Sequence, residues 1–164
     1  MKCERGVVMQ TVTVPMESLA QLIVLQLKEN QTAKLTVTGI SMMPMLRHRE
    51  DQVMLIPVAG CCKPGDIILY RRENGRYVLH RIIRLIENGY ICCGDNQAEE
   101  EIVMHNQLIA VVNGFIRNEK TYKLNHLGYR AYVFVWVKLF WLRPIYIKIR
   151  RRIGRFLGKQ RKKK

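Results

Sequence analysis

Short runs in which apolar and polar residues alternate make up most of the chain between residues 34 and 118. Alternation with a period of two is the pattern of a strand with one buried face. Asn74-Gly75 and Asn88-Gly89 stand between such runs, and Asn-Gly is a strong signal for a tight hairpin turn. The sequence therefore predicts a mainly β core of short strands joined by tight turns. The predicted strands are residues 34–40, 51–58, 67–71, 76–86, 90–93 and 107–115.

Residues 15–28 follow a helical period instead. Leu19, Ile23 and Leu27 recur at i, i+4 and i+8, and Pro15 stands near the start of the run. This spacing predicts an amphipathic helix with one buried face. Its apolar run is too short to cross a bilayer. The residues before it lack the continuous apolar stretch of a signal peptide, so none is predicted.

The chain changes character after residue 118. Residues 131–149 are rich in aromatic and aliphatic side chains, but Lys138, Arg143 and Lys148 interrupt them. These charges would lie at mid-span in a transmembrane helix, where they are costly, whereas an interfacial helix keeps them among the headgroups. The pattern favours a helical tail that lies on an anionic membrane. A single membrane span, and a helix packed on its own domain or on a partner, are the alternatives.

The net charge of +15 belongs to this tail. Residues 120–164 hold fifteen of the 28 Lys and Arg and no Asp or Glu, which leaves thirteen basic and thirteen acidic residues in 1–119. Such a segregated block indicates an anionic partner, either a membrane surface or nucleic acid. The aromatic and aliphatic content of 131–149 suits lipid better than nucleic acid, and the basic run 159–164 would strengthen binding to anionic lipid.

Length and composition bound the domain organisation. With 164 residues, of which 48% are hydrophobic and 25% charged, the chain is globular and long enough for one ordinary core. We therefore expect an N-terminal helical segment in residues 1–33, a β domain in 34–118 and a basic aromatic tail in 119–164.

The five cysteines predict neither a metal site nor a disulfide framework. Cys61-Cys62 and Cys92-Cys93 are adjacent pairs, and Cys3 stands alone. Zinc sites commonly space their cysteines as C-x-x-C, and adjacent cysteines form a disulfide only with strain. We expect reduced thiols in a reducing compartment, no metal ion and no cofactor.

Candidate catalytic residues fall in one short span of the chain. Ser41 lies in the run Gly-Ile-Ser-Met-Met-Pro, His80 lies in an apolar run, and Asp95 follows a glycine and precedes an asparagine. Serine attacks a carbonyl only when a neighbouring base takes its proton and backbone N–H groups hold the developing oxyanion. These three residues supply a nucleophile, a base and an acid.

Together these motifs resemble the signal peptidase I superfamily. Its members share a serine in a G/S-x-S-M-x-P box, a base on a following strand and a G-D-N loop. Residues 63–68, Lys-Pro-Gly-Asp-Ile-Ile, are similar to the family's P-G-D-I-V segment, and the resemblance covers residues 35–115. It implies a coiled, barrel-like β fold with His80 on a hairpin strand beside Ser41.

The resemblance also implies the identity of the base. The bacterial type and the self-cleaving repressors place a lysine there, whereas the endoplasmic-reticulum and archaeal type places a histidine before an arginine. His80 and Arg81 stand in that position, while Lys63 lies ahead of the proline-glycine turn and does not match the family's lysine. The chain therefore resembles the Ser/His branch, which implies that His80 is the general base.

Two carboxylates compete for the role of orienting His80. Asp95 belongs to the G-D-N motif itself. Glu101 lies in an acidic run, residues 99–101, where the family's members carry an aspartate. We expect Asp95 to be a site residue. Glu101 is the favoured orienting carboxylate, and Asp95 is the alternative for that role.

Two features depart from the family pattern. Gly39 stands where some bacterial members have a serine, so the Ser41 backbone N–H would carry more of the oxyanion charge, with Thr38 as a further candidate donor. Family members also usually carry an N-terminal membrane anchor before the serine box, and no such stretch precedes Ser41 in this sequence.

Each candidate residue also has a purely structural explanation. Alone, Ser41 would be a turn serine, His80 a packed histidine and Asp95 an Asx-turn residue. Their joint occurrence in the family's order favours catalysis. Surface or loop positions are expected for the other histidines, His48, His105 and His126.

The sequence thus predicts a serine endopeptidase in which Ser41 attacks, His80 acts as general base and then acid, and Asp95 or Glu101 orients it. The implied substrate is an extended signal or leader peptide, cut after small residues, that adds a strand to the active-site sheet. The tail predicts membrane association, peripheral or through one C-terminal span, with the catalytic domain on the cytoplasmic side. The alternatives are a catalytically inactive membrane- or nucleic-acid-binding module of the same fold, and a self-cleaving repressor, which would require a lysine base.

Overall fold

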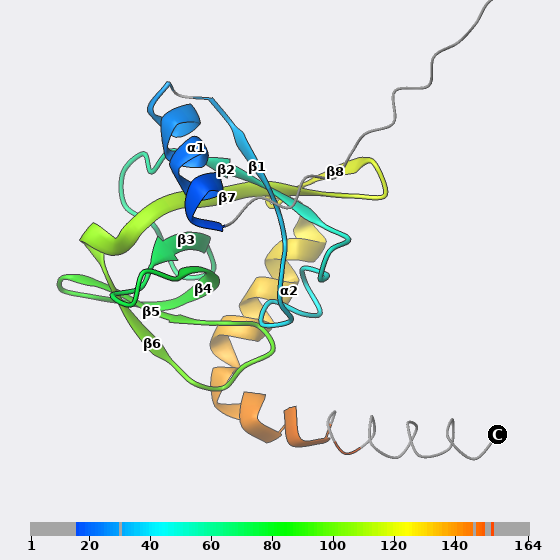
Figure 1. Cartoon of the computed structure of the whole chain (residues 1–164). Helices are drawn as coiled ribbons and strands as arrows, with labels where there is room; N and C mark the ends of the chain where they lie inside the picture. The colour runs from blue at the N-terminus through cyan, green and yellow to red at the C-terminus, as the bar shows by residue number, and fades with distance from the viewer. Residues whose placement is uncertain (1–15, 30, 146, 150–151, 153–164) are drawn as a thin grey trace, which may run out of the picture.

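Within the described residues, eight strands form one curled antiparallel sheet with helices on its outside (Figure 1). The structure is a computed structural model that describes residues 16–29, 31–145, 147–149 and 152. The predicted mainly β fold class is confirmed. The elements in chain order are α1 (Met16–Lys28), β1 (Ala33–Thr36), β2 (Gln52–Ile56), β3 (Ile67–Arg71), β4 (Tyr77–Ile86), β5 (Gly89–Cys93), β6 (Glu101–Met104), the 3-10 helix η1 (His105–Gln107), β7 (Leu108–Arg117), β8 (Lys120–Lys123), α2 (Leu127–Lys138) and the 3-10 helix η2 (Phe140–Leu142).

Strand β7 is the centre of the sheet. The strand order is β1-β2-β7-β3-β4-β5-β6, and β7 also pairs with β8. Strands β3, β4 and β5 follow one another as hairpins, with the first turn at the predicted Asn74-Gly75 and the second at Asn88-Gly89. Each predicted strand corresponds to an observed one. Strands β6 and β8 are additional to the prediction.

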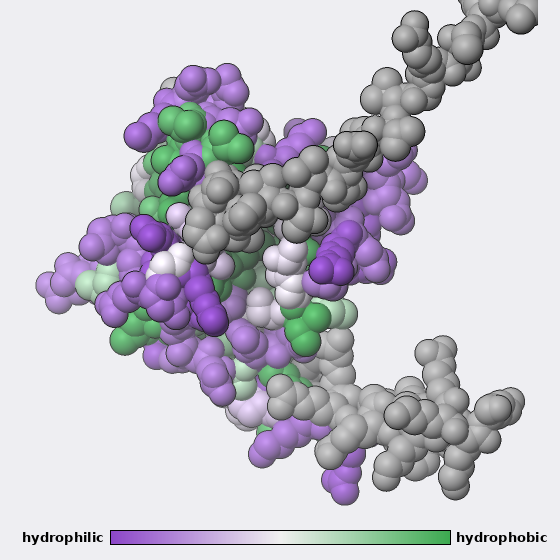
Figure 2. Space-filling view, viewed as in Figure 1, coloured by the Kyte–Doolittle hydropathy of each residue, from purple (hydrophilic) through white to green (hydrophobic). Residues whose placement is uncertain are grey.

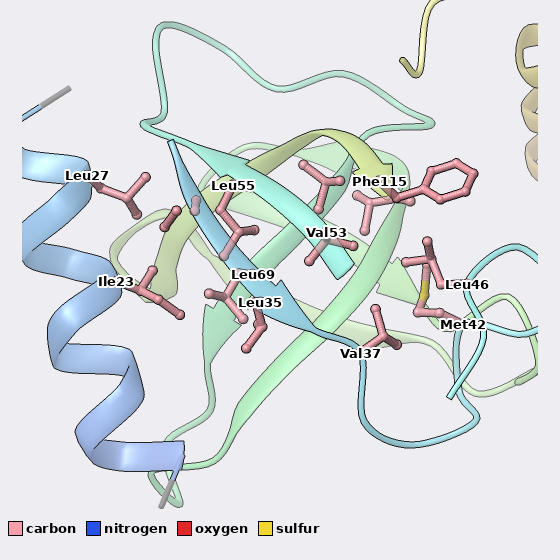
Figure 3. Packing of buried hydrophobic residues seen from close by; sticks show 14 residues of the cluster. Ile23, Leu27, Leu35, Val37, Met42, Leu46, Val53, Leu55, Leu69 and Phe115 are labelled. Carbon is pink, nitrogen blue, oxygen red and sulfur yellow. The ribbon is translucent and has the colours of Figure 1, made fainter. Parts of the chain in front are cut away.

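The larger core cluster lies between α1 and the sheet. Figure 3 shows Ile23 and Leu27 of α1 directed towards the sheet residues Leu35 and Leu55, and all four side chains are buried. Burying aliphatic side chains of this size stabilises the fold by about 1.5–3 kcal/mol each. The predicted amphipathic helix is thus present with its apolar face inward, although the side chain of Leu19 lies outside the described residues.

The loop between β1 and β2 carries Ser41 and is tied to the body of the protein at both ends. Met42 and Leu46 are buried in the same core cluster (Figure 3). Asp51, also buried, accepts hydrogen bonds from Arg117 Nε and Nη2 at 2.8 and 2.6 Å. Although burial alone would raise the pKa of Asp51, the bonds from Arg117 and the Arg47 backbone lower it, so the carboxylate stays ionised.

The tail is more closely joined to the β domain than the sequence indicated. The predicted boundary at residue 118 falls inside the β7–β8 hairpin, so Lys120–Lys123 belongs to the sheet. Helix α2 then packs on the domain through Tyr129, which is buried, while Leu127 on the same helix is 81% exposed. No helix among the described residues is both long enough and apolar enough to cross a bilayer.

The surface seen in Figure 2 is largely hydrophilic, with hydrophobic patches between. One patch lies over α1, whose Leu22 and Leu25 are exposed. The predictions made for Cys3, Pro15 and the basic run 159–164 lie outside the described residues.

Candidate active site

Ser41 is held by its backbone and by its neighbour in sequence. The next residue, Met42, is buried in the core. Met43 N–H donates to the Ile40 carbonyl at 3.2 Å, and Leu46 N–H donates to the Met42 carbonyl at 2.9 Å, which closes turns around the serine. Ser41 itself is half-buried. Core packing and turn hydrogen bonds therefore fix the backbone position of Ser41.

The segment 94–97, which we call the GDN loop, lies directly against Ser41. Asn96 donates its backbone N–H to the Ser41 carbonyl at 2.7 Å and its side-chain Nδ2 to the Ile40 carbonyl at 3.2 Å. A Cβ added at Gly94 would lie 2.7 Å from the Ser41 carbonyl oxygen and 3.1 Å from its Cβ. The loop can approach the serine this closely because residue 94 has no side chain.

His80 is buried in β4 and faces Tyr70 of the neighbouring strand β3. Its Nδ1 lies 3.1 Å from the Tyr70 hydroxyl oxygen and 3.7 Å from Glu101 Oε2. The Tyr70 hydroxyl donates to Glu101 Oε2 at 2.7 Å, and Arg72 Nε and Nη2 donate to the same carboxylate at 2.6 and 2.7 Å. Tyr70 therefore connects the histidine to Glu101.

The directions of these hydrogen bonds set the tautomer of His80. A tyrosine hydroxyl has one hydrogen, and Tyr70 uses it on Glu101, so its oxygen accepts from His80 Nδ1. We assign the ring proton to Nδ1 on this basis, which leaves a lone pair on Nε2. A lone pair on Nε2 is what a general base requires.

The pKa values of the three groups agree with this assignment. Burial lowers the pKa of His80 to about 4, against the opposing effect of Glu101, so the imidazole is neutral at pH 7. Burial raises the pKa of Tyr70, and its bond to Glu101 raises it further, so the phenol keeps its proton. Burial would raise the pKa of Glu101, but the bonds from Arg72 and Tyr70 lower it.

Gly94 lies next to Ser41 and near His80 in the sheet register. The β4–β5 register pairs Arg81 with Cys93, and continuing it by one residue sets Gly94 opposite His80. Ser41 lies against Gly94 on the side where a Cβ of residue 94 would point. Within the described residues the Ser41 hydroxyl makes no hydrogen bond to His80. Catalytic hydrogen bonds are often loose in structures without substrate and tighten when it binds.

Asp95 is engaged by a different partner. Its Oδ1 and Oδ2 accept from Arg81 Nε and Nη2 at 2.8 and 2.7 Å, and both side chains are fully buried. Tyr132 donates its hydroxyl to Asp95 Oδ2 at 3.0 Å. Of the two carboxylates predicted to compete for His80, the structure places Glu101 beside the ring and gives Asp95 the role of anchoring the GDN loop.

The candidate oxyanion donors differ in availability. Gly39 has a φ of +92° and donates its N–H to His48 Nδ1 at 2.8 Å, so this amide is occupied. The exposed His48 thus has a role in shaping the turn before the serine. The Ser41 N–H makes no hydrogen bond with the described part of the chain, and its role as an oxyanion donor stays a prediction.

Tyr70 and Arg72 are the site residues that the sequence pattern missed. Tyr70 reads as one more apolar position in a strand, and Arg72 follows it as a charged strand end. The pairing of β3 with β4 sets Tyr70 opposite Val78. Val78 and His80 are two residues apart on β4, so their side chains lie on the same face of the sheet. The hairpin register could therefore have identified Tyr70 as a neighbour of His80. Aligning the two strands about the Asn74-Gly75 turn gives that register.

Cys61, Cys62, Cys92 and Cys93 are free cysteines in the described structure. Cys92 is buried, and burial raises its pKa to about 12. Among the described residues no cluster of His, Cys, Asp and Glu could hold a metal ion. A cavity of about 650 Å³ lies between the turn at residues 63–66 and α2, and its lining includes neither Ser41 nor His80.

Comparison with protein-family models and with curated proteins finds no match to this sequence. Function is therefore inferred from the arrangement of Ser41, His80, Tyr70 and Glu101 and from the surface of the tail.

Proposed function

We propose that this protein is a serine endopeptidase in which Ser41 is the nucleophile and His80 the general base. One observation carries the proposal: the hydrogen-bond chain from His80 Nδ1 through Tyr70 to Glu101. It keeps the ring proton on Nδ1 and leaves the lone pair on Nε2, while burial keeps the imidazole neutral at pH 7. Gly94 lies against Ser41 and, in the β4–β5 register continued by one residue, opposite His80, which supports the pairing of this serine with this base.

In the first half of the reaction, His80 Nε2 takes the proton of the Ser41 hydroxyl as its oxygen attacks the substrate carbonyl. The Ser41 N–H donates to the oxyanion that forms. The imidazolium that forms faces the ionised Glu101 through Tyr70, which stabilises the positive charge. His80 then gives the proton to the leaving amine, and a water molecule activated by the same base hydrolyses the acyl-enzyme.

Strand β1 offers a place for an extended substrate. Within the described residues β1 pairs with β2 alone, so its other edge has free backbone N–H and C=O groups. The chain runs from β1 directly to Ser41. A peptide that adds a strand along residues 33–40 would bring its scissile bond to the serine, and the resemblance to the Ser/His signal peptidases implies a signal or leader peptide.

A peptide-cleavage assay tests the proposal. A labelled leader-peptide library is incubated with the wild-type protein, with Ser41→Ala and with His80→Gln, whose amide keeps a polar group in the buried site. We expect cleavage after small residues by the wild type and a loss of at least about a thousandfold in both variants. Circular dichroism verifies that each variant is folded. A folded wild type that cleaves none of the peptides, and does not react with a fluorophosphonate at Ser41, would favour a non-catalytic binding module.

We also infer that the tail lies on an anionic membrane. From Leu127 onwards the outer side of the helical segment carries exposed apolar residues, with basic residues exposed beside them. An interfacial helix buries its apolar residues in the acyl region and places its basic residues at the anionic headgroups. The exposed apolar residues are Leu127, Phe134, Val135, Leu139, Trp141, Ile145 and Ile149, and the exposed basic residues are Arg130, Lys138, Lys148 and Arg152.

Co-sedimentation with vesicles tests this inference. We expect binding to vesicles that contain phosphatidylglycerol, weakened by salt, and little binding to phosphatidylcholine alone. Phe134→Ser/Trp141→Ser removes apolar area and should weaken binding. Leu85→Ser/Ile102→Ser removes exposed apolar area from β4 and β6 and serves as the matched control. Equal binding by both double variants, or preferential binding to oligonucleotides, would contradict a lipid-facing tail.

A further inference from the structure

The GDN loop has a second neighbour on the side away from Ser41, the C-terminal helical segment. Trp136 Nε1 donates to the Asp95 carbonyl at 3.1 Å, and the Tyr132 hydroxyl donates to the Asp95 side chain at 3.0 Å. The two rings stack on each other with centroids 4.9 Å apart. Helix α2 thus turns the polar ends of two aromatic side chains towards the loop.

Arg143, just beyond η2, reaches the same loop. Its Nη1 donates to the carbonyl oxygens of Gly94 and Gln97 at 3.1 and 3.4 Å, and its Nη2 donates back to the Trp136 carbonyl at 2.9 Å. The side chain is buried, and its charged group lies 4.5 Å from the centroid of the Phe140 ring. A buried arginine whose hydrogen bonds go to main-chain carbonyls fixes the path of that main chain.

The loop is therefore held from two sides. The helical segment donates to the carbonyls of residues 94, 95 and 97, and Asn96, between them, donates to the Ser41 and Ile40 carbonyls. Without the helical segment, the Asp95 carbonyl would lose its indole donor, and the Gly94 and Gln97 carbonyls would keep only donors from their own stretch of chain, the Gln97 N–H and the Cys93 thiol. Losing hydrogen bonds to buried carbonyls is costly. A change in the loop path would move Asn96 and, with it, the serine.

We propose that Trp136 and Arg143 are positioning residues for Ser41, acting through the GDN loop. This inference rests on the proposed peptidase function for its kinetic consequence. The membrane-facing helical segment is then also part of the catalytic unit, since its inner side fixes the loop that fixes the nucleophile. Displacing a nucleophile by about 1 Å can cost about a hundredfold in rate.

The organisation of the segment supports this role. In an ordinary surface helix the apolar side packs inward and the polar side faces water. Here hydrogen-bonding side chains face the loop, and Phe134 and Trp141 are 64% and 70% exposed. The side of the helical segment that faces the loop holds it mainly through hydrogen-bond donors. Burial of apolar side chains contributes less to this contact. In Figure 1, α2 and α1 lie at opposite sides of the sheet, so α1 does not help to position the GDN loop.

The test combines kinetics with amide hydrogen exchange on full-length protein. Trp136→Phe removes the indole donor and keeps an aromatic ring, and Arg143→Met removes the guanidinium and keeps an apolar chain. We expect kcat to fall about 10- to 100-fold in each, with KM changed by less than about threefold. Protection of the Asn96 amide, which donates to Ser41, should fall at least about tenfold. Arg143→Lys retains a charged donor and should recover part of both.

Arg84→Met is the matched control, because Arg84 is an exposed arginine that pairs with Glu100 and makes no contact with the GDN loop. It should change neither kcat nor the exchange of Asn96. Wild-type-like kcat and Asn96 protection in folded Trp136→Phe and Arg143→Met would overturn the inference. A wild type without peptidase activity, combined with lost Asn96 protection in both variants, would overturn the peptidase and leave the positioning role supported.

Discussion

Arg81 of β4 and Asp95 of the GDN loop are joined by two parallel hydrogen bonds of 2.8 and 2.7 Å, and neither side chain is exposed. The same guanidinium donates to the Gly65 carbonyl at 2.8 Å and to the Tyr129 hydroxyl at 2.9 Å. One buried arginine thus ties the loop beside Ser41 to the turn before β3 and to α2.

Removing one member of this pair should be strongly destabilising, because the other charge would remain buried without a partner. We expect Arg81→Met to lower the free energy of unfolding by about 3–5 kcal/mol, measured by urea denaturation at pH 7. Asp95→Leu should cost a similar amount. The double variant Arg81→Met/Asp95→Leu should lose clearly less than the sum of the two. Additive losses would show that the pair is not coupled.

Glu101 should matter for catalysis more than its neighbour Glu100. Glu101→Gln removes the carboxylate that accepts from Tyr70, so Tyr70 is free to reverse its hydrogen bond with His80 Nδ1. It also removes the charge that faces the imidazolium, so kcat should fall about 10²–10⁴-fold. Glu100→Gln is the control, because Glu100 pairs with Arg84 on the surface. Steady-state peptide cleavage measures both. Similar kcat values for the two variants would assign the orienting role elsewhere.

The buried His80 should make stability depend on pH. Its pKa is lowered to about 4 in the folded protein by burial, against about 6.5 in the unfolded chain, so between these values the unfolded state binds more protons. The stabilising contribution is full above pH 6.5 and is lost as the pH falls towards 4, with a size of the order of 3 kcal/mol. Urea denaturation at pH 7, 6 and 5 should show the loss in the wild type and a smaller one in His80→Gln. An equally steep loss in the variant would refute the assignment.

Gly94 should tolerate no side chain. A Cβ there would lie 2.7 Å from the Ser41 carbonyl oxygen, so Gly94→Ala must shift the serine or the loop and should lower kcat by about tenfold or more. Gly128→Ala is the control, because a Cβ at that helical position meets its nearest atom at 3.4 Å. It should be neutral or stabilise the protein by up to about 1 kcal/mol. Peptide cleavage and thermal melting distinguish the two variants.

The thiols should differ sharply in reactivity. Cys61 is exposed, whereas Cys92 and Cys93 are buried, and burial raises their pKa values to about 12 and about 11. In a Cys3→Ser background, iodoacetamide at pH 8 should alkylate Cys61 within minutes and leave the buried thiols unmodified until the protein is unfolded. Mass spectrometry of tryptic peptides reads out each site. Rapid native labelling of Cys92 or Cys93 would contradict the described packing.

Local sequence patterns predict the parts of this fold that depend on local physics. The Asn-Gly turns at residues 74–75 and 88–89 set the β3–β5 hairpins, and the helical spacing of Ile23 and Leu27 predicts α1 with its buried face. Short motifs around Ser41 and His80 likewise predict them as site residues. Such signals need no knowledge of distant contacts.

The remaining parts depend on contacts between distant residues. Tyr70 meets Glu101 across 31 positions of sequence, and Asp95 meets Arg81 across 14, so no local pattern chooses between the two carboxylates. Strand β8 is almost entirely exposed and lacks the alternation of a half-buried strand. The outer side of α2 is apolar, so the sequence alone would predict that this side faces the domain. In the structure, the side of α2 that carries the hydrogen-bonding side chains faces the domain instead.

The central place of β7 has a consequence for the synthesis of the protein. Its partners β2 and β3 are translated some forty or more residues earlier than β7 itself, yet each needs β7 to complete its hydrogen bonding. Until residue 117 has left the ribosome, the nascent chain holds two unpaired hairpin edges of the kind that chaperones shield. Prematurely terminated chains that end before β7 should therefore be targets for proteolysis.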